Sequence, residues 1–413
     1  MRLRSTSLVV GTGLAVFGAS SYAYLAVAAR RTSVPAYSEL SLLWVVTMTA
    51  GIGLFLPLEQ ELARFLADRR GRGEDAGAGV VVAAQAAAVL VAFVVLLAVV
   101  LREPLARFLG SPGLVWAAAL GVAGQAVAYL VRGVTAGSQQ FRVYAWQLAL
   151  EGGLRVVAAG LLAADGVHDV LPYAAVLGAA SIVSALVTVP AVRAVARQRG
   201  RRVARRELSR SFGWLVVATV FAQLLANAAP VLVRYAGGGS EAATGRFFSS
   251  LLVARVPLFL FAAVQAVLLP SLSRSLGAGD RTAFRLAQGR VERAVAAFAA
   301  VSLVAAATIG VPVVRLLFGA RYALDLPGLV LLVGGAGAYL LASTAAQSAL
   351  ALGWHRRVAL GWAVGCGTGA LALLLPAGLT TRAASCFLVG AAMSATVLLA
   401  AVHDRLSPVA VPA

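Results

Sequence analysis

The sequence FFSSLLVARVPLFLFAAVQAVLLPSL, residues 247–272, is apolar over the length of a membrane-spanning helix. About 20 apolar helical residues cross the hydrocarbon core of a bilayer, so this stretch predicts a transmembrane helix. Arg255 lies near its middle and is followed by Pro257. A cation at membrane depth is costly unless it faces protein or water, and a proline kink needs neighbouring helices to support it. We therefore expect Arg255 to line a cavity between helices, with snorkelling to the membrane surface or pairing to a neighbouring helix as the alternative.

The rest of the chain has the composition of a polytopic membrane protein. Of its 413 residues, 61% are hydrophobic and only 12% are charged, whereas soluble domains carry about 25% charged residues. The formal net charge is +19 and no Lys occurs, so every basic residue is Arg. These arginines lie mostly in short loops between apolar segments, unlike the basic face of a nucleic-acid binder. We therefore expect a membrane protein without a nucleic-acid partner.

Twelve apolar segments follow one another and predict twelve transmembrane helices. They lie near residues 7–29, 37–62, 79–101, 114–134, 144–164, 173–192, 213–234, 247–272, 295–317, 327–351, 358–378 and 384–402. The loops on the side of the N-terminus hold 24 arginines, and the opposite loops hold nine. Because arginines are retained on the cytoplasmic side, we expect both termini in the cytoplasm and the protein in the cytoplasmic (inner or plasma) membrane. Ala26-Val27-Ala28 resembles a signal-peptidase site, but the apolar run before it is long for a signal peptide, so we expect an uncleaved first helix.

Short matches about half a chain apart indicate an internal duplication. The loop after the third span contains Pro104-Leu-Ala-Arg107 and Pro112-Gly-Leu-Val115, and the loop after the ninth contains Pro312-Val-Val-Arg315 and Pro327-Gly-Leu-Val330. Six helices separate the copies, so both have the same orientation. The predicted fold is therefore that of an all-α membrane protein, with two pseudo-symmetric six-helix bundles around a central cleft. The predicted domains are residues 1–195, a basic cytoplasmic linker at 196–212, and residues 213–413.

One cytoplasmic loop has the pattern of a surface helix. In RTAFRLAQGRVER, residues 281–293, one apolar stripe contains Ala283, Ala287 and Val291, and arginines occupy the other faces. This pattern is typical of a helix that lies in the headgroup region of the membrane, with a solvated loop as the alternative.

Further charged residues in or beside the predicted spans are candidate site residues. Glu151 and Arg155 are four residues apart in the fifth span, so they share one helical face. They either neutralise each other or line the cleft, and Glu151 is also our candidate for a protonatable group. Arg64 and Arg234 end the second and seventh spans, and Glu59 lies near the inner end of the second. We expect these three residues at a gate or an interface, where arginines anchor helices and Glu59 is a candidate proton carrier.

The sequence offers little for catalysis or for binding a metal. Only two Cys and three His occur, and their scattered positions fit neither a zinc site nor a disulfide framework. No Gly-rich phosphate loop, nucleophile elbow or pair of catalytic acids occurs on a soluble segment. We therefore expect a protein that is not an enzyme and that binds no cofactor or metal.

The sign of the intramembrane charge predicts the class of substrate. A cleft that contains Arg155 and Arg255, with few acidic residues to offset them, would attract an anion such as a phosphate-bearing lipid. An exporter of cationic drugs would need carboxylates within the membrane, and the first span contains none.

Four segments carry a resemblance to a known family. They are Val34-Pro-Ala-Tyr37; Arg132-Gly133 through Glu151 and Arg155; Ala254-Arg-Val-Pro257 through Pro270-Ser-Leu-Ser273; and Leu316-Leu-Phe-Gly-Ala-Arg-Tyr322. Over nearly its whole length the chain resembles the polysaccharide-repeat (Wzx-type) flippases of the multidrug/oligosaccharidyl-lipid/polysaccharide (MOP) exporter superfamily. The resemblance implies alternating access by two six-helix bundles and translocation of polyprenyl-diphosphate-linked oligosaccharide across the cytoplasmic membrane. It also implies that Arg155 and Arg255 face the diphosphate or acidic sugars, with membrane lipids and the glycosyltransferases and polymerase of the same pathway as candidate partners.

Other functions stay open at this point. A lipid II-type peptidoglycan-precursor flippase of the superfamily usually has two further helices, whereas a MATE-like multidrug or cation antiporter also has twelve. A membrane glycosyltransferase or polymerase usually needs a large outer loop with catalytic residues, and the longest outer segment here, around residues 234–246, is short. A scaffold without transport activity is the last alternative, and only the intramembrane arginines oppose it.

Overall fold

The computed structural model describes residues 2–75, 77–197, 212–236, 241–258 and 281–406. In these residues the regular structure is helical throughout, without a strand. The first half contains α1 (Arg2–Arg31), α2 (Val34–Gly71), α3 (Gly77–Val100), α4 (Arg102–Leu109), α5 (Pro112–Gly137), α6 (Phe141–Ala164) and α7 (Val170–Ala196). The second half contains α9 (Phe212–Ala236), α10 (Glu241–Ala254), α12 (Arg281–Ala305), a π-helical turn (Ala306–Gly310), α13 (Val311–Phe318), a 3-10 turn (Ala320–Tyr322), α14 (Leu326–Ala351), α15 (His355–Leu371), a 3-10 turn (Ala372–Leu374) and α16 (Leu379–Leu406).

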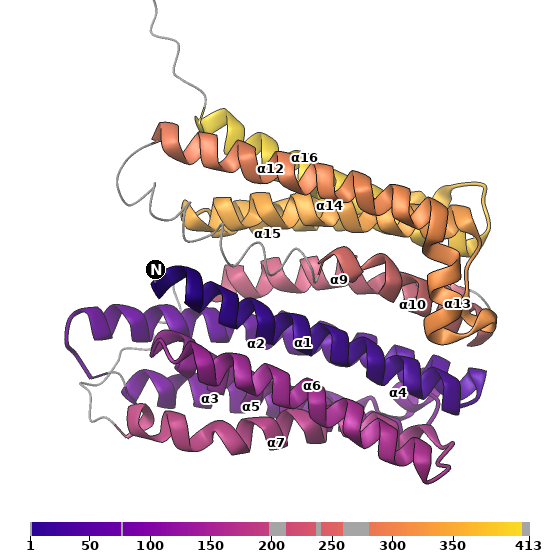
Figure 1. Ribbon diagram of the computed structural model, residues 1–413, viewed down its shortest axis with the longest axis horizontal. Helices are drawn as coiled ribbons and strands as arrows, with labels where there is room; N and C mark the ends of the chain where they lie inside the picture. Colours follow the sequence, from indigo (N-terminus) through magenta and orange to yellow (C-terminus); the bar gives the residue numbers. More distant parts are fainter. Residues whose placement is uncertain (1, 76, 198–211, 237–240, 259–280, 407–413) are drawn as a thin grey trace, which may run out of the picture.

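The long helices form two six-helix bundles that lie side by side (Figure 1). The first bundle contains α1, α2, α3, α5, α6 and α7, and the second contains α9, α10, α12, α14, α15 and α16. Eleven helices in the described part of the chain are long and apolar enough to cross a membrane, so this is a multi-pass membrane protein. The predicted eighth span, 247–272, is described only as far as residue 258, and most of the predicted linker, 196–212, also lies outside the described residues.

The duplicated motifs occupy equivalent places in the two bundles. Residues 104–107 lie in the short helix α4, and residues 312–315 lie in the short helix α13. Each short helix is followed by a glycine at positive φ, Gly110 at 106° and Gly319 at 102°. Residues that carry a Cβ are strained in this region, so glycine ends each helix without strain. Both short helices lie at the same end of the molecule, opposite the N-terminus (Figure 1).

Residues 281–293 are helical, as the prediction of a surface helix requires, and not a loop. These residues form the first half of α12, and residues 284–318 together make one apolar helical segment long enough to cross a membrane. Phe284, Val291 and Val295 are buried, and Val291 and Val295 belong to one cluster with Leu340 of α14. One side of this helix therefore packs on protein, and its place in the headgroup region stays a prediction.

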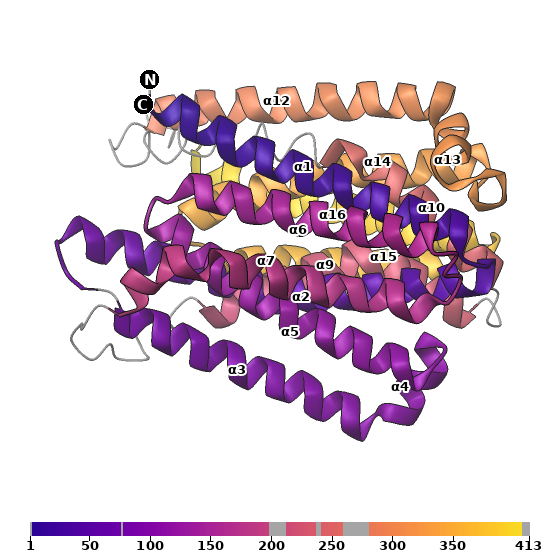
Figure 2. The ribbon, with the colours of Figure 1, turned by 60° about the horizontal axis from the view of Figure 1, so that its bottom comes forward.

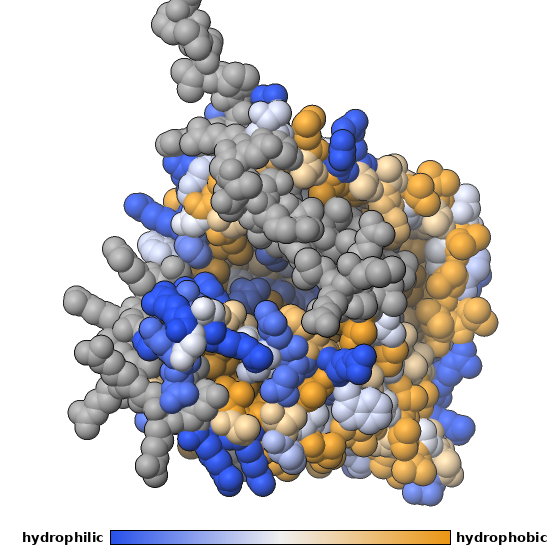
Figure 3. All heavy atoms as spheres, turned by 60° about the vertical axis from the view of Figure 1, so that its left-hand side comes forward, coloured by the Kyte–Doolittle hydropathy of each residue, from blue (hydrophilic) through white to orange (hydrophobic). Residues whose placement is uncertain are grey.

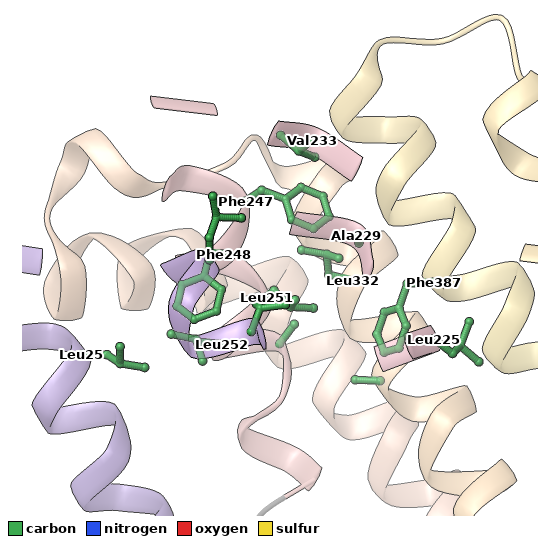
Figure 4. Close-up of a cluster of buried hydrophobic side chains, with 14 of the residues drawn as sticks. Leu25, Leu225, Ala229, Val233, Phe247, Phe248, Leu251, Leu252, Leu332 and Phe387 are labelled. Atoms are coloured by element: carbon green, nitrogen blue, oxygen red, sulfur yellow. The ribbon is translucent and has the colours of Figure 1, made fainter. Parts of the chain in front are cut away.

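The largest hydrophobic core of the described residues crosses from one bundle to the other. Phe247, Phe248, Leu251 and Leu252 of α10 lie among side chains of α9, α14 and α16, and Leu25 of α1 approaches from the first bundle (Figure 4). A second core takes its buried members from α2, α3, α5 and α7 only. The two bundles therefore share a core over part of their length, while the first bundle has a core of its own elsewhere.

The two ends of the molecule differ in how closely the bundles meet. We call the end that carries the start of α1 the open end, and the end that carries α4 and α13 the clasped end. Figure 3 looks toward the open end and shows a recess with hydrophilic side chains on its floor and beside it. The central cleft predicted from the sequence is therefore present, and it is entered from the open end.

α3 and α12 lie at opposite edges of the molecule (Figure 2). Both are strongly apolar, yet only 11% of the most apolar window of α3, and 17% of that in residues 284–318, is buried inside the protein. Val89 and Val100 of α3, for example, are each 68% exposed. An apolar helix whose side chains point away from the protein is suited to contact with lipid tails, which accounts for the sequence of both helices.

Candidate functional site

A break in α10 holds Arg255 at the place where the two bundles meet. The helix ends at the residue before Arg255, and Pro257 has no backbone N–H with which to continue the helical hydrogen bonds. The backbone N–H of Arg255 is shared between the carbonyls of Leu251 (3.1 Å) and Leu252 (3.0 Å). The carbonyl of Leu252 also accepts a hydrogen bond from the hydroxyl of Tyr22 on α1, at 2.7 Å. A side chain of the first bundle therefore binds the turn that positions Arg255.

The partners of the Arg255 guanidinium are neutral. Its Nη1 donates to Oδ1 of Asn227 at 2.8 Å, and Nδ2 of Asn227 donates in turn to Oε1 of Gln223 at 2.9 Å. The ring centroid of Phe387 lies 5.9 Å from its Cζ. Its Nη2 is buried without a hydrogen-bond partner, and no acidic side chain in the described part of the chain pairs with it. Arg255 is thus a cation with unused hydrogen-bonding capacity, as expected of a group that binds an anion.

Glu151 is the centre of a second group of charges, buried inside the first bundle. One of its carboxylate oxygens pairs with Arg132 of α5, and the other lies 2.5 Å from Nη2 of Arg155 on its own helix. The Ser181 hydroxyl of α7 donates to the same carboxylate at 2.7 Å. We call these four residues the Glu151 cluster. The exposed fraction of the Glu151 and Arg155 side chains is 0%, and that of Arg132 is 5%, so in this state the cluster does not reach the cleft.

Glu59 of α2 lies near the Glu151 cluster and is also buried. Its Oε1 accepts a hydrogen bond from the hydroxyl of Tyr144 on α6 at 2.9 Å, while its Oε2 is buried without a partner. The charge of Arg132 acts on Glu59 as it does on Glu151. Two carboxylates therefore accompany the two arginines inside the first bundle, and Glu59 belongs to this interior and not to the surface between the bundles.

The two arginines predicted at span ends lie at opposite ends of the molecule. Arg64 is at the open end of α2, where its exposed side chain pairs with Glu61 at 2.7 Å. Arg234 is half-buried near the end of α9, at the clasped end. Neither residue contacts Arg255 or the Glu151 cluster among the contacts of the described residues.

The structure does not bring Arg155 and Arg255 to one site, although the sequence analysis expected both in the cleft. Successive residues of α1 lie between them. Ser21 accepts a hydrogen bond from Arg155 at 3.4 Å, and Tyr22 binds the turn of Arg255. Adjacent residues of a helix point about 100° apart, so α1 separates the two guanidinium groups. Glu151 and Arg155 were expected either to neutralise each other or to line the cleft, and in the structure they pair with each other.

Arg132 belongs to the Glu151 cluster, although the sequence analysis did not name it as a candidate site residue. Its side chain is buried and paired. A signal for it existed in the sequence. A short turn connects α5 to α6, and two antiparallel helices joined in this way bring residues at similar distances from the turn together. Arg132 and Glu151 lie five and ten residues from the helix ends, and the long arginine side chain spans the offset of about 7.5 Å along the helix axis.

At the clasped end, two arginines join the bundles in a reciprocal way. Arg30 of α1 donates to the carbonyls of Leu316 and Leu317 (the latter at 3.1 Å), near the C-terminal end of α13. Arg321 of the second bundle donates to the carbonyls of Ala29 and Thr32, at 2.9 and 3.3 Å, near the C-terminal end of α1. Each arginine thus satisfies carbonyls that a helix end leaves without intrahelical partners. We call these contacts the arginine clasp.

An aromatic cluster lies beneath the arginine clasp. Tyr37 of α2 contacts Phe248, Phe318 and Tyr322 of the second bundle, with ring centroids 6.4, 6.4 and 4.8 Å away. Its hydroxyl also accepts a hydrogen bond from Ser249 at 3.3 Å. All four rings are buried, so this cluster closes the clasped end to water while the other end stays open.

The described helices thus form two packed bundles with a cleft that is open at one end and closed at the other. Solved structures of MATE transporters of the MOP superfamily have this fold. A mutant of the MATE transporter VcmN from Vibrio cholerae matches with a TM-score of 0.70 and 16% identity, over 98% of this chain and 96% of that one. A MOP superfamily transporter from Pyrococcus furiosus, described as having a binding pocket of reverse polarity that suggests a different function, matches with a TM-score of 0.73 and 14% identity, over 98% and 95%. An outward-facing multidrug resistance MATE family transporter gives a TM-score of 0.73 at 14% identity, over 98% and 95%.

The sequence comparisons are less specific. Uncharacterized proteins of Mycobacterium bovis and Mycobacterium tuberculosis are 27% identical over 274 residues, which is 66% of this chain and 62% of those proteins. The match thus spans less than two thirds of the relatives' length. No family model matches the chain. The fold is therefore that of MATE and other MOP transporters, and the substrate has to be argued from the residues of the cleft.

Proposed function

We propose that this chain is a flippase that moves an anionic lipid-linked glycan, of the polyprenyl-diphosphate-linked class, across the cytoplasmic membrane by alternating access. The observation that carries the proposal is Arg255, a cation at a helix break between the bundles, hydrogen-bonded to Asn227 and lacking an acidic partner in the described residues. A diphosphate offers the charge and the acceptor oxygens that such a guanidinium lacks. Broken helices at mid-membrane are also where transporters of many folds bind their substrates.

The charge bias of the loops supports an orientation with both termini in the cytoplasm. In that orientation the open end admits substrate from the cytoplasmic side, and the arginine clasp keeps the outer side shut. The headgroup binds near Arg255 while the lipid tail stays in the bilayer. Opening of the clasp and closure of the other end then release the headgroup outside. Arg155 and Glu151 act in this scheme as a rigid element of the first bundle, and the enzymes that build and polymerise the glycan act before and after the flippase.

The test is transbilayer movement of a fluorescent polyprenyl-diphosphate oligosaccharide in proteoliposomes. Replacement of Arg255 by Gln is expected to lower the initial rate about tenfold or more, since a charge-assisted hydrogen bond to a phosphate contributes about 1.5–3 kcal/mol. Arg255→Lys keeps the charge and is expected to retain part of the activity. Arg193→Gln, at an exposed arginine at the end of α7, is the matched control and is expected to transport normally.

Two outcomes would contradict the proposal. Equal rates for Arg255→Gln and Arg193→Gln would make Arg255 a structural residue. Absence of movement by the unaltered protein with several diphosphate-linked glycans, including a peptidoglycan precursor, would exclude this substrate class.

A multidrug or cation antiporter is the second candidate, because two of the similar structures are described as MATE transporters. Its binding site would need an accessible carboxylate, but Glu59 and Glu151 are buried inside the first bundle. Efflux of cationic dyes from cells that express the protein distinguishes the two. Dye efflux that survives Arg255→Gln and fails in Glu59→Gln would favour the antiporter.

A further inference from the structure

A pocket at the clasped end is separate from the cleft and bridges the two bundles. Its volume is about 500 Å³, and its lining residues are Pro104, Arg107 and Phe108 of α4 and Arg234 and Tyr235 of α9. Phe108 and Tyr235 stack across the seam, with ring centroids 5.4 Å apart and ring planes at 19°. The pocket therefore combines two guanidinium groups with an aromatic wall, and both bundles contribute to each feature.

The charge of the pocket favours an anion. Arg107 is exposed, and no ion pair joins it to an acidic side chain in the described ranges. Arg234 adds a second positive charge from the opposite bundle. Two arginines that approach one space from different elements suit the several oxygens of a phosphate group better than a single carboxylate.

The level of the pocket relative to the membrane indicates the source of its ligand. α3 and α9 are candidate membrane spans that end at Val100 and Ala236, so α4 and the last residues of α9 lie at the boundary between hydrocarbon and water. Tyr235 is 71% exposed there, as is typical of aromatic residues at a membrane interface. Phosphates of membrane lipids occupy this level. Next to the pocket, Val99 and Val100 of α3 are 53% and 68% exposed and offer an apolar surface to acyl chains.

We propose that this pocket binds the phosphate headgroup of an anionic membrane lipid at the seam between the bundles. The ligand lies against α4 and α9, and its acyl chains follow the outer face of α3. Because residues of both bundles line the pocket, it is complete only while the clasped end is closed. The lipid therefore stabilises the closed state of this end by mass action. This proposal does not depend on the transported substrate.

The experiment measures lipid binding to the purified protein in neutral detergent by native mass spectrometry. Phosphatidylglycerol is titrated against phosphatidylcholine, for the unaltered protein, for Arg107→Gln and for Arg102→Gln. Arg102 lies on the same short helix and is exposed, but it does not line the pocket, so it is the matched control. We expect phosphatidylglycerol to bind more tightly than phosphatidylcholine, with affinity about tenfold lower in Arg107→Gln and unchanged in Arg102→Gln.

Three outcomes would overturn the proposal. Equal affinity of Arg107→Gln and Arg102→Gln for phosphatidylglycerol would show that the lipid does not bind in this pocket. Equal affinity of the unaltered protein for the two lipids would show that the anionic headgroup is not what the protein recognises. Inorganic phosphate that protects the protein from thermal unfolding in an Arg107-dependent way, while phosphatidylglycerol does not bind, would show a site for a soluble anion instead of a lipid. Unchanged unfolding temperatures of the ligand-free variants verify that both are folded.

Discussion

At the scale of single residues, the Glu151 cluster determines how the first bundle tolerates two buried arginines. Glu151 supplies an oxygen to Arg132 and another to Arg155. Glu151→Gln keeps the shape but removes the negative charge to which Arg132 and Arg155 are both paired, which leaves Glu59 as the one carboxylate that acts on Arg132 among the described residues of this buried site. Breaking a buried ion pair from one side costs about 3–5 kcal/mol. We expect a large decrease in the unfolding temperature of the purified variant, measured by intrinsic fluorescence in detergent.

An exposed ion pair provides the control for this prediction. Asp68 and Arg72 of α2 pair at 2.6 Å, but both side chains are more than half exposed. Exposed pairs contribute about 0–1 kcal/mol, so Asp68→Asn is expected to leave the unfolding temperature nearly unchanged. Comparable decreases for Asp68→Asn and Glu151→Gln would mean that the Glu151 cluster does not stabilise the first bundle.

The residue-level site could be predicted from the sequence only in part. The pairing of Glu151 with Arg155 follows from a spacing of four residues on one helix, and spacing is visible in a sequence. The contacts of Arg255 with Asn227, and of Glu151 with Arg132, join different helices. Such contacts depend on how far each helix is rotated about its axis, which apolar sequence of nearly uniform hydrophobicity does not define. The same reason explains why Arg155 and Arg255 were expected together although α1 separates them.

At the scale of elements, Gly319 ends α13 in a conformation that other residues avoid. Its φ and ψ are 102° and 157°, a region that is essentially restricted to glycine. A Cβ at this position meets no atom within 4 Å, so any cost of Gly319→Ala arises from the backbone alone. We expect the free energy of unfolding to decrease by about 1–3 kcal/mol, measured as a lower unfolding temperature.

Gly153 of α6 is the matched control for that substitution. It is helical, and a Cβ there also meets no atom within 4 Å. Gly153→Ala is expected to raise the free energy of unfolding by about 0.5–1 kcal/mol, because alanine favours the helix more than glycine does. A decrease in both variants would indicate that alanine is harmful for a reason other than backbone conformation.

Most of the transmembrane helices could be predicted, because the length and hydrophobicity of a membrane-spanning helix are visible in the sequence. The duplication could also be recognised, because its two copies contain the same Pro, Arg and Gly positions that shape α4 and α13. The helix expected at residues 281–293 is present, but its packing on protein could not be predicted, because a stripe of small apolar residues fits a lipid surface and a protein groove equally well. The packing depends on α14, whose Leu340 lies in one cluster with Val291.

At the scale of the whole molecule, the direction in which the cleft opens depends on contacts between residues nearly 300 positions apart. Arg321 reaches Ala29 over 292 positions of sequence. Such pairs have no local signal, so the sequence predicts two bundles and a cleft but not which end is closed. In the alternating-access scheme proposed above, the closed state competes with an alternative in which the same helices pack at the other end, and the difference between two such states is typically a few kcal/mol.

The arginine clasp is expected to set that balance. Arg30→Gln with Arg321→Gln removes the donors that each bundle offers to helix carbonyls of the other. Because Arg30 and Arg321 are both exposed, each loss weakens the closed state by about 1 kcal/mol, and the pair shifts the ratio of closed to open molecules on the order of tenfold or more. Spin labels are attached at Glu103→Cys and Leu326→Cys, which lie in different bundles at the clasped end, after the two native cysteines are replaced. Electron double resonance then reports the shift as a longer distance between the labels.

Arg315→Gln, at an exposed arginine of α13 outside the clasp, should leave the distance distribution unchanged. A distribution that is the same in the double variant and in Arg315→Gln would mean that the buried rings around Tyr37, and not the arginines, hold this end closed.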